Sequence, residues 1–246
     1  MANTRGIFTL RYILEEKIPF DEWVSLDDVW IDYPTIVSPN TGYFGGGYPK
    51  TARMDKLSYS SDTTAYTPSA NLTVSRLGAG ATGNSTHGYF GGGFPTSSLM
   101  DKVTYSTDTT AAVPGAALSA ARYFLAATGN STAGYFGGGR AVGGATSLMD
   151  KVTYASDTTA AVPGANLSAA RYYLAATGNS EAGYFGGGTP NPGTTTMDKV
   201  TYSSDTTAAV PGANLSVARQ NLAATSARAN ALPETAVISS PAPVIV

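Results

Sequence analysis

Short stretches of alternating apolar and polar residues recur along most of the chain, and each ends at a turn signal. One unit contains four such stretches: "YYLAAT" (172–177), "AGYFGGG" (182–188), "KVTYS" (199–203) and "TTAAV" (206–210). Aromatic and β-branched residues favour strands, whereas "GNSE", "SDTT" and "PGA" favour turns and strand ends. The pattern predicts four short antiparallel strands per unit, with positive φ at the Gly and Asn of "GNSE".

This unit is an internal repeat. Its first aromatic recurs at spacings of 46, 46 and 49 residues, as Tyr43, Tyr89, Tyr135 and Tyr184. The motif "MDK" also occurs four times, and the length differences fall between it and "GYFGGG", which predicts variable surface loops there. The residues that define the repeat are the glycine triplets Gly45, Gly46, Gly47, Gly91, Gly92, Gly93, Gly137, Gly138, Gly139, Gly186, Gly187 and Gly188, and the arginines Arg76, Arg122, Arg171 and Arg219.

Four antiparallel strands in about 40–50 residues are typical of a β-propeller blade. The unit resembles the kelch repeat over residues 41–226. The likeness rests on the arginine before the first strand, the glycine cluster that ends the second, and a tyrosine in the third (Tyr59, Tyr105, Tyr154 and Tyr202). The later tryptophan of kelch repeats is missing, and "TAAV" replaces it. We therefore expect an all-β, kelch-like propeller.

The two ends of the repeat region are offset by one strand. The first unit begins at "TGYFGGG", and the last arginine is followed by "QNLAATSARA" without another "GYFGGG". We expect "NLAATS" (221–226) to pair with residues 42–47, which closes a ring of about four blades. An open arc completed by another subunit is the alternative.

The glycines, aromatic residues and arginines that recur in the units are expected to have structural roles. The glycines are expected near the axis, where inner strands crowd together and side chains do not fit. The Tyr and Phe before each triplet are expected to pack between blades. The arginines are expected to bind carbonyl groups or aspartates of a neighbouring blade.

The segments outside the repeats suggest a different role. Residues 1–40 form the predicted N-terminal anchor, and residues 227–246 form a proline-punctuated, extended tail. Aromatic anchors dominate many protein interfaces. The anchor residues expected to dock on a partner are Phe8, Leu10, Tyr12, Trp23, Val29 and Trp30. A cap over one face of the propeller is the alternative role for this segment.

Composition narrows the classes of partner. The net charge of −2 gives no basic field for nucleic acid, and no apolar run has the length of a membrane span or signal peptide. The chain has no cysteine, which excludes disulfides, thiolate metal sites and a cysteine nucleophile. Only 13% of residues are charged, as in repeat proteins rich in Gly, Ala, Ser and Thr.

Candidate catalytic groups are sparse. The single histidine, His87, occupies a position that holds Ala or Thr in the other units, which favours a surface role. The four "MDK" aspartates could surround a cation, but hydrogen bonding within or between blades is the favoured interpretation. We therefore expect no enzyme activity, no catalytic residue, no metal site and no cofactor.

The whole pattern also resembles a class of virion proteins of tailed bacteriophages. The matching residues are Met1–Gly6, Val29–Trp30 and Asn40–Gly47, together with the repeats. The resemblance implies a non-enzymatic structural protein of the virion, assembled in the host cytoplasm and located on the tail or as a head appendage. Its implied partners are other virion proteins, in several copies of a symmetric assembly. The alternative is a receptor- or carbohydrate-binding module that uses the variable loops.

Overall fold

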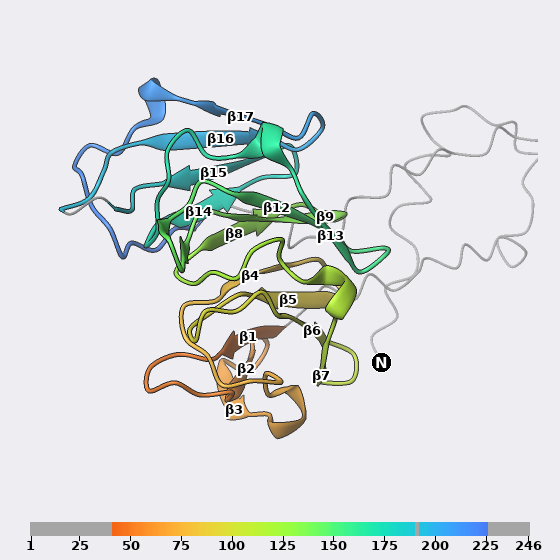
Figure 1. Cartoon of the computed structure of the whole chain (residues 1–246). Coiled ribbons are helices and arrows are strands. Elements are labelled where there is room, and N and C mark those ends of the chain that lie inside the picture. Colours follow the sequence, from red (N-terminus) through yellow and green to blue (C-terminus); the bar gives the residue numbers. More distant parts are fainter. Residues whose placement is uncertain (1–40, 190–191, 226–246) are drawn as a thin grey trace, which may run out of the picture. The chain divides into compact units, whose positions relative to one another are not determined.

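The computed structural model describes residues 41–189 and 192–225. The chain divides into two units, residues 1–36 and 37–246, and all described residues belong to the second. The expected anchor (1–40), its docking residues and the expected tail (227–246) lie outside the described residues. The described part is all-β, with antiparallel sheets and short 3-10 turns (Figure 1). No helix in this part is long and apolar enough to cross a membrane.

Apart from one small hairpin, the described strands form four sheets that follow one another along the chain. Sheet I contains β1 (Thr41–Gly45), β2 (Met54–Ser58) and β3 (Thr63–Tyr66). Sheet II contains β4 (Gly80–Gly83), β5 (His87–Gly91), β6 (Met100–Thr104) and β7 (Thr109–Ala112). Sheet III contains β8 (Ala126–Gly129), β9 (Ala133–Gly137), β12 (Met149–Thr153) and β13 (Thr158–Ala161). Sheet IV contains β14 (Ala175–Gly178), β15 (Ala182–Gly186), β16 (Met197–Thr201) and β17 (Thr206–Ala209).

Smaller elements lie between these strands. A hairpin of β10 (Arg140–Ala141) and β11 (Gly144–Ala145) occupies the longest variable loop. A 3-10 turn follows the last strand of each sheet: η2 (Pro68–Ala70), η3 (Pro114–Ala116), η4 (Pro163–Ala165) and η5 (Pro211–Ala213). Proline at the start of each turn has no N–H to donate, which ends the strand ladder. The "PGA" prediction of a strand end is confirmed.

The predicted strand order within a unit is confirmed, but one turn is built differently. In the "GNSE" turn the side-chain oxygen of Asn179 accepts hydrogen bonds from the backbone N–H groups of Glu181 and Ala182, and φ is not positive. Positive φ falls instead on the aspartate of "SDTT", such as Asp205 at 51°. The asparagine side chain closes the first turn, so the backbone needs no left-handed residue there.

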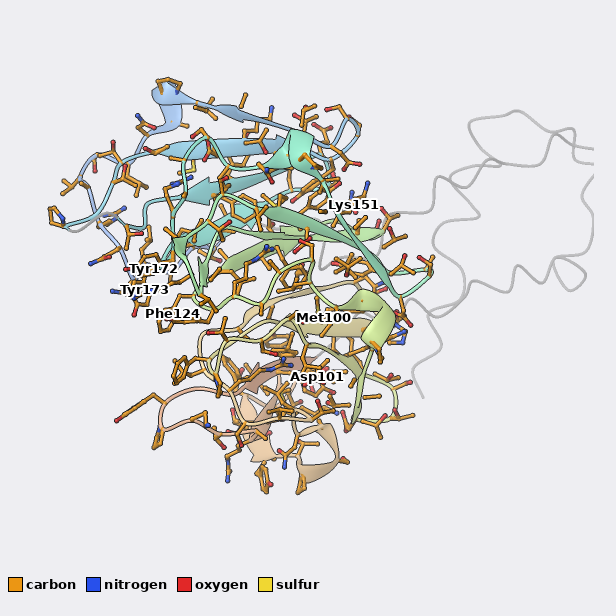
Figure 2. The ribbon with its side chains drawn as sticks, viewed as in Figure 1. Met100, Asp101, Phe124, Lys151, Tyr172 and Tyr173 are labelled. Atoms are coloured by element: carbon orange, nitrogen blue, oxygen red, sulfur yellow. The ribbon has the colours of Figure 1, made fainter. Side chains whose placement is uncertain are left out.

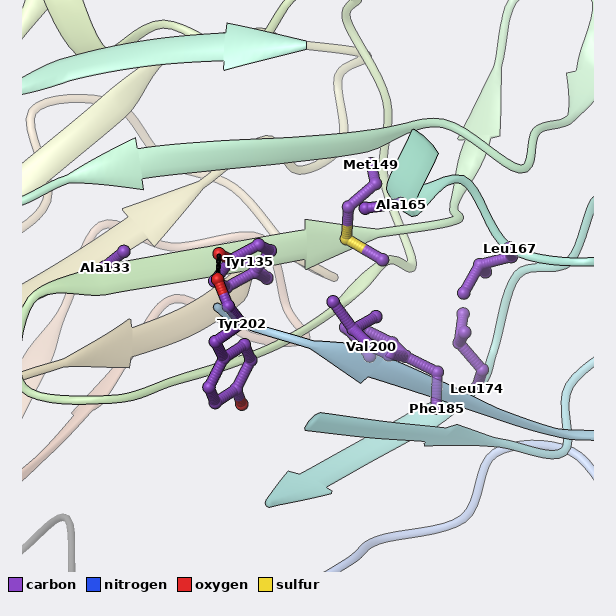
Figure 3. Packing of buried hydrophobic residues seen from close by; sticks show 10 residues of the cluster. Ala133, Tyr135, Met149, Ala165, Leu167, Leu174, Phe185, Val200 and Tyr202 are labelled. Carbon is purple, nitrogen blue, oxygen red and sulfur yellow. Dashed lines mark hydrogen bonds between the residues drawn. The ribbon is translucent and has the colours of Figure 1, made fainter. Parts of the chain in front are cut away.

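Each pair of neighbouring sheets encloses one apolar cluster. Between sheets III and IV the cluster contains Tyr135 and Met149 from one sheet and Phe185 and Tyr202 from the other (Figure 3). The Tyr135 and Tyr202 rings stack at 4.8 Å. The expected packing of the second-strand aromatics between units is therefore confirmed. Since burying one such side chain contributes about 1.5–3 kcal/mol, these clusters hold the sheets together.

The glycine triplets have a different cause from the one expected. The first strands β4, β8 and β14 make most of the contacts from sheet to sheet, and β9 and β15, which carry the triplets, make fewer, with the first strand of the preceding sheet. Gly138 follows β9 with φ of 66°, and a Cβ there would lie 2.6 Å from the carbonyl oxygen of Arg171. The glycine is needed because its backbone is left-handed and the next unit's arginine segment approaches closely.

The predicted pairing of residues 221–226 with residues 42–47 is not formed by the described residues. Sheet I has only three strands and β1 is an edge strand, while residues 221–225 belong to no strand. Residue 226 lies outside the described part. Accordingly Phe44 on β1 is 62% exposed, whereas its counterpart Phe136 on β9 is fully buried.

Candidate binding surface

One backbone position has an uncommon conformation in every unit. It is occupied by Gly78, Phe124, Tyr173 and Asn221, with φ between 54° and 67°. Left-handed backbone is rare for bulky side chains and marks sites where the surroundings impose it. Here successive units impose it through backbone hydrogen bonds: the N–H of Phe124 donates to Gly78 O at 2.7 Å, that of Tyr173 to Phe124 O at 3.0 Å, and that of Asn221 to Tyr173 O at 2.9 Å.

The side chains at and beside this position form a continuous row of rings, called here the aromatic surface. Its members are Phe94, Tyr123, Phe124, Tyr172 and Tyr173. Neighbouring ring centroids are 5.4, 4.8, 4.2 and 4.9 Å apart along the row. Figure 2 shows three of the rings at the same end of the sheets. Phe94 is 45% exposed and the others are half-buried, so solvent reaches the row.

A shallow hollow of about 290 Å³ adjoins the aromatic surface. Its lining is contributed in the same way by successive units: Gly78 and Ala79, Phe124 and Leu125, Tyr173 and Leu174, and Asn221 and Leu222. Small-molecule sites are typically concave, mainly apolar and aromatic, with a few polar groups that fix orientation. The hollow has this composition, since the only polar side chains in its lining are a tyrosine and an asparagine.

Polar groups border the rings. The guanidinium of Arg140 lies over the Tyr172 ring at 5.5 Å from its centroid. Burial raises the pKa of Tyr173, and the neighbouring Tyr172 and Tyr123 add to the shift. Its hydroxyl is therefore protonated at neutral pH and can donate a hydrogen bond. The surface thus offers flat apolar faces with hydroxyl, amide and guanidinium groups at their edges.

The variable loops lie at the same end of the sheets as the aromatic surface. Phe94, from the loop "FPTSSL", forms a bridge with Leu77. Arg140, from "RAVGGATSL", forms a bridge with Tyr123. The backbone N–H of Thr189 donates to Tyr172 O at 2.9 Å. The loops that differ most between units therefore surround the row of rings.

The arginines were predicted to bind carbonyl groups or aspartates of a neighbouring blade, and three of the four bind such groups within their own unit instead. Arg76, Arg122 and Arg171 are buried and form ion pairs with Asp101, Asp150 and Asp198 at 2.5, 2.8 and 2.5 Å. Their guanidinium groups also donate to backbone carbonyls of the same sheet. Burial lowers the pKa of each arginine, and its aspartate works in the opposite direction. Arg219 is exposed.

These ion pairs occupy the "MDK" aspartates that were considered as cation ligands. Asp101, Asp150 and Asp198 bind arginine, and Asp55 binds Arg53 at 3.1 Å. Within residues 41–189 and 192–225, no group of three or more His, Cys, Asp or Glu side chains lies close enough to hold a metal ion.

The single histidine lies away from the aromatic surface, at the start of β5. His87 is half-buried, and its Nδ1 lies 2.8 Å from Thr86 Oγ1. Burial and nearby Lys102 lower its pKa, while Asp157 acts to raise it. These contacts fit the expected structural position at the edge of a turn.

Sequence reasoning missed the aromatic surface. The available signal was the pair of adjacent aromatics after two of the repeat arginines, "RYF" at 122–124 and "RYY" at 171–173. Adjacent residues of a strand face opposite sides, so strand alternation alone predicts that one ring of each pair is buried. The left-handed backbone at Phe124 and Tyr173 breaks that alternation and places both rings at the surface.

Comparison with known proteins gives the fold but no family. No protein-family model matches the chain, and no curated protein does. A solved structure titled "Structure of YjhT" is similar, with a TM-score of 0.60 and 12% sequence identity. The match covers 74% of this chain and 64% of that chain. At this identity the similarity concerns the arrangement of the sheets alone.

Proposed function

We propose that the chain is a non-enzymatic virion protein of a tailed phage that binds carbohydrate on the host surface through the aromatic surface. In this proposal the four sheets are blades of a kelch-like β-propeller, and residues 1–40 attach it to other virion proteins, most directly of the tail. The aromatic surface is the observation that carries the binding function. The virion setting rests on the resemblance of the leader and the "GYFGGG" units to phage virion proteins.

The chemistry of the aromatic surface suits a sugar. One face of a pyranose ring carries mainly C–H groups, which pack on the electron-rich face of an aromatic ring. The hydroxyl groups of the sugar remain at the edges, where Tyr173, Asn221 and Arg140 offer donors and acceptors. A shallow, open surface also accepts an internal segment of a polysaccharide, which an enclosed pocket excludes.

The charged residues of the repeat support a non-enzymatic role. Three arginines are paired with buried aspartates in sheets II, III and IV, and three lysines pair with the aspartate of the next unit's turn. These groups hold the sheets together and are not directed at a common ligand. The binding surface therefore uses the residues that the repeat leaves free to vary.

Binding can be tested with Phe124→Ala and Tyr173→Ala. We expect the purified protein to bind at least one glycan class on an array of bacterial surface glycans. Each variant should lower the affinity by roughly tenfold or more, because aromatic anchors dominate such contacts. Tyr66→Ala is the matched control, since Tyr66 is an exposed aromatic on β3, outside the aromatic surface. An array without binding, or affinity retained in both variants, contradicts the carbohydrate proposal.

Attachment can be tested separately with the double variant Trp23→Ala/Trp30→Ala. We expect a folded, β-rich protein that no longer enters particles, since each lost interfacial tryptophan commonly costs about 2 kcal/mol or more. Normal incorporation of this variant contradicts attachment through the leader and leaves the glycan result unaffected.

A further inference from the structure

The contacts between successive sheets repeat three times. The earlier sheet supplies one set of residues, called here the first half of the interface, and the later sheet supplies the other set, called the second half. In each instance a second-strand tyrosine of one sheet stacks on the tyrosine that directly follows the third strand of the next sheet. The pairs are Tyr43–Tyr105, Tyr89–Tyr154 and Tyr135–Tyr202, with centroids 5.2, 4.9 and 4.8 Å apart. The same tyrosine hydroxyl donates to the aspartate in the turn of the next sheet: Asp108, Asp157 and Asp205.

Two further contacts join the same halves. A lysine of one sheet forms an ion pair with the turn aspartate of the next, as Lys56–Asp108, Lys102–Asp157 and Lys151–Asp205 at 2.8, 2.7 and 2.8 Å. A threonine hydroxyl of the later sheet donates to the carbonyl of a buried alanine in the preceding 3-10 turn. These pairs are Thr110–Ala70, Thr159–Ala116 and Thr207–Ala165.

Sheet IV carries the first half of this interface without the second half. In sheet IV the residues that match the first half are Tyr184, Lys199 and Ala213, and Arg219 lies in the segment that follows. We call these four residues the last face. Ala213 and Arg219 are exposed, although their counterparts in the other units are buried. Within the described residues no turn aspartate lies beyond Lys199 to pair with it.

Sheet I carries the second half without the first. Its counterparts are Asp55, Tyr59, Asp62 and Thr64, which we call the first face. Tyr59, Asp62 and Thr64 are exposed. The Asp55 side chain is 34% exposed, whereas the aspartate at this position in the other three sheets is fully buried against arginine. The last face offers what this face lacks: a tyrosine, a lysine, a carbonyl and an arginine.

The backbone shows the same complementarity. β1 is an edge strand among the described residues, and in the other sheets the matching strand pairs with an inner strand that follows an arginine. In these sheets the pairs Ala81–Phe90, Ala127–Phe136 and Ala176–Phe185 lie opposite one another. Residues 222–225 repeat the inner-strand sequence after Arg219 and are the strand that sheet I lacks. This register places Ala224 opposite Phe44.

We propose that the last face of one copy of this chain binds the first face of a second copy, with residues 222–225 adding the fourth strand to sheet I of that copy. The interface would reproduce the internal one, with Lys199 against Asp62, Arg219 against Asp55 and Tyr184 against Tyr59. Two such contacts, related by a two-fold axis, close a ring of two copies. Such a ring contains eight sheets, within the common range of four to eight for propellers.

Cysteine crosslinking tests the strand addition, because the natural chain has no cysteine to interfere. Directly opposite residues of an antiparallel pair have Cα atoms about 4.5–5.5 Å apart, which suits a disulfide. We expect a mixture of the single variants Phe44→Cys and Ala224→Cys to form a covalent dimer on mild oxidation. Mixing Phe44→Cys with Val142→Cys, on an exposed loop, should form none.

Two results of the crosslinking overturn the proposal. The double variant Phe44→Cys/Ala224→Cys could form its disulfide within one chain, which means that each ring closes on itself. The mixture could form no disulfide while the protein sediments as a monomer, which means that other residues of the same chain occupy the edge of β1.

Charge reversal tests the faces without relying on cysteines. We expect sedimentation equilibrium to give the mass of two chains for the natural protein. Lys199→Asp or Asp62→Lys alone should raise the dissociation constant roughly tenfold or more, because like charges then face one another. The combination Lys199→Asp/Asp62→Lys should restore the dimer, and Lys50→Asp, an exposed lysine on a loop, should leave it unchanged. Single variants that dimerise normally, or a combination that does not recover, contradict the proposal.

Discussion

Strands β1 and β9 have the same Gly-Tyr-Phe-Gly sequence and lie in different surroundings. In sheet III, β9 is flanked by β8 and β12, and Phe136 is fully buried in the apolar cluster between sheets II and III. In sheet I, β1 has one neighbour, β2, and Phe44 is mostly exposed. The difference shows that burial in this protein belongs to the interface between units and not to the strand itself. Identical residues therefore contribute very different free energies in different units.

The arginine position should give the largest contrast. Arg122→Met leaves Asp150 buried without its partner, and removing one partner of a buried pair costs about 3–5 kcal/mol of unfolding free energy. Arg219→Met removes an exposed residue and should cost less than about 1 kcal/mol. Urea denaturation in the Lys199→Asp background isolates the single chain from self-association. Equal losses at the two positions contradict the contrast between internal and outer units.

The third glycine of the triplet should give a smaller, graded contrast. Both Gly139 and Gly47 have positive φ, so alanine is strained at either site by about 1–2 kcal/mol. A Cβ at Gly139 would also lie 3.0 Å from Leu125 Cβ, whereas a Cβ at Gly47 would meet no atom within 4 Å. We expect Gly139→Ala to lower the free energy of unfolding by about 1 kcal/mol more than Gly47→Ala. If Gly47→Ala is the more damaging, another segment packs on that site.

The lysine–aspartate pairs should give the smallest effect, and it depends on pH. Burial acts to raise the pKa of Asp205, but hydrogen bonds from Lys151 and Tyr135 and the charge of Lys151 outweigh it, and the pKa is lowered. The same holds for Asp108 and Asp157. A carboxyl with a lowered pKa stabilises the fold above its unfolded pKa, about 3.9, and this contribution is lost as pH falls through the folded pKa.

Melting temperatures measured between pH 6 and pH 2 test this. The natural protein should lose stability below about pH 4. Asp205→Asn and Lys151→Met should each be less stable at pH 6, by less than about 1 kcal/mol because the pair is partly exposed. In both variants the melting temperature should fall less between pH 6 and pH 2 than in the natural protein. The reduction in this fall should be the same for the two variants. A decline that neither variant alters means that this pair contributes nothing to the acid sensitivity.

Much of the repeat could be predicted from local sequence. The strands predicted at "AGYFGGG", "KVTYS" and "TTAAV" follow from alternation and from β-branched residues, and Pro at the 3-10 turns ends each unit. The third strand begins and ends two residues earlier than predicted, at "MDKVT". The sequence could predict that charged residues of the repeat form ion pairs, but not which residues pair. Lys151 and Asp205 are 54 residues apart, so their contact depends on how one unit packs on the next.

The aromatic surface and the closure of the ring could not be predicted from local sequence patterns. Phe124 and Tyr173 adopt left-handed backbone because the preceding unit's carbonyl accepts their N–H, and no propensity of Phe or Tyr predicts that. The offset between the two ends was visible in the sequence as a missing first strand at the start of the repeats and an extra one at their end. Whether the offset is filled within one chain or by another depends on the angle between sheets, which no short motif encodes.

The hydrogen bonds that link Gly78, Phe124, Tyr173 and Asn221 have an evolutionary consequence. Each unit is joined to the next through the same backbone position, and the residue there can be Gly, Phe, Tyr or Asn. A gene that gained or lost one whole unit by recombination between its near-identical repeats would still encode matching ends. The number of units can therefore change in a single genetic step without a new interface having to evolve, while the loops around the rings diverge independently.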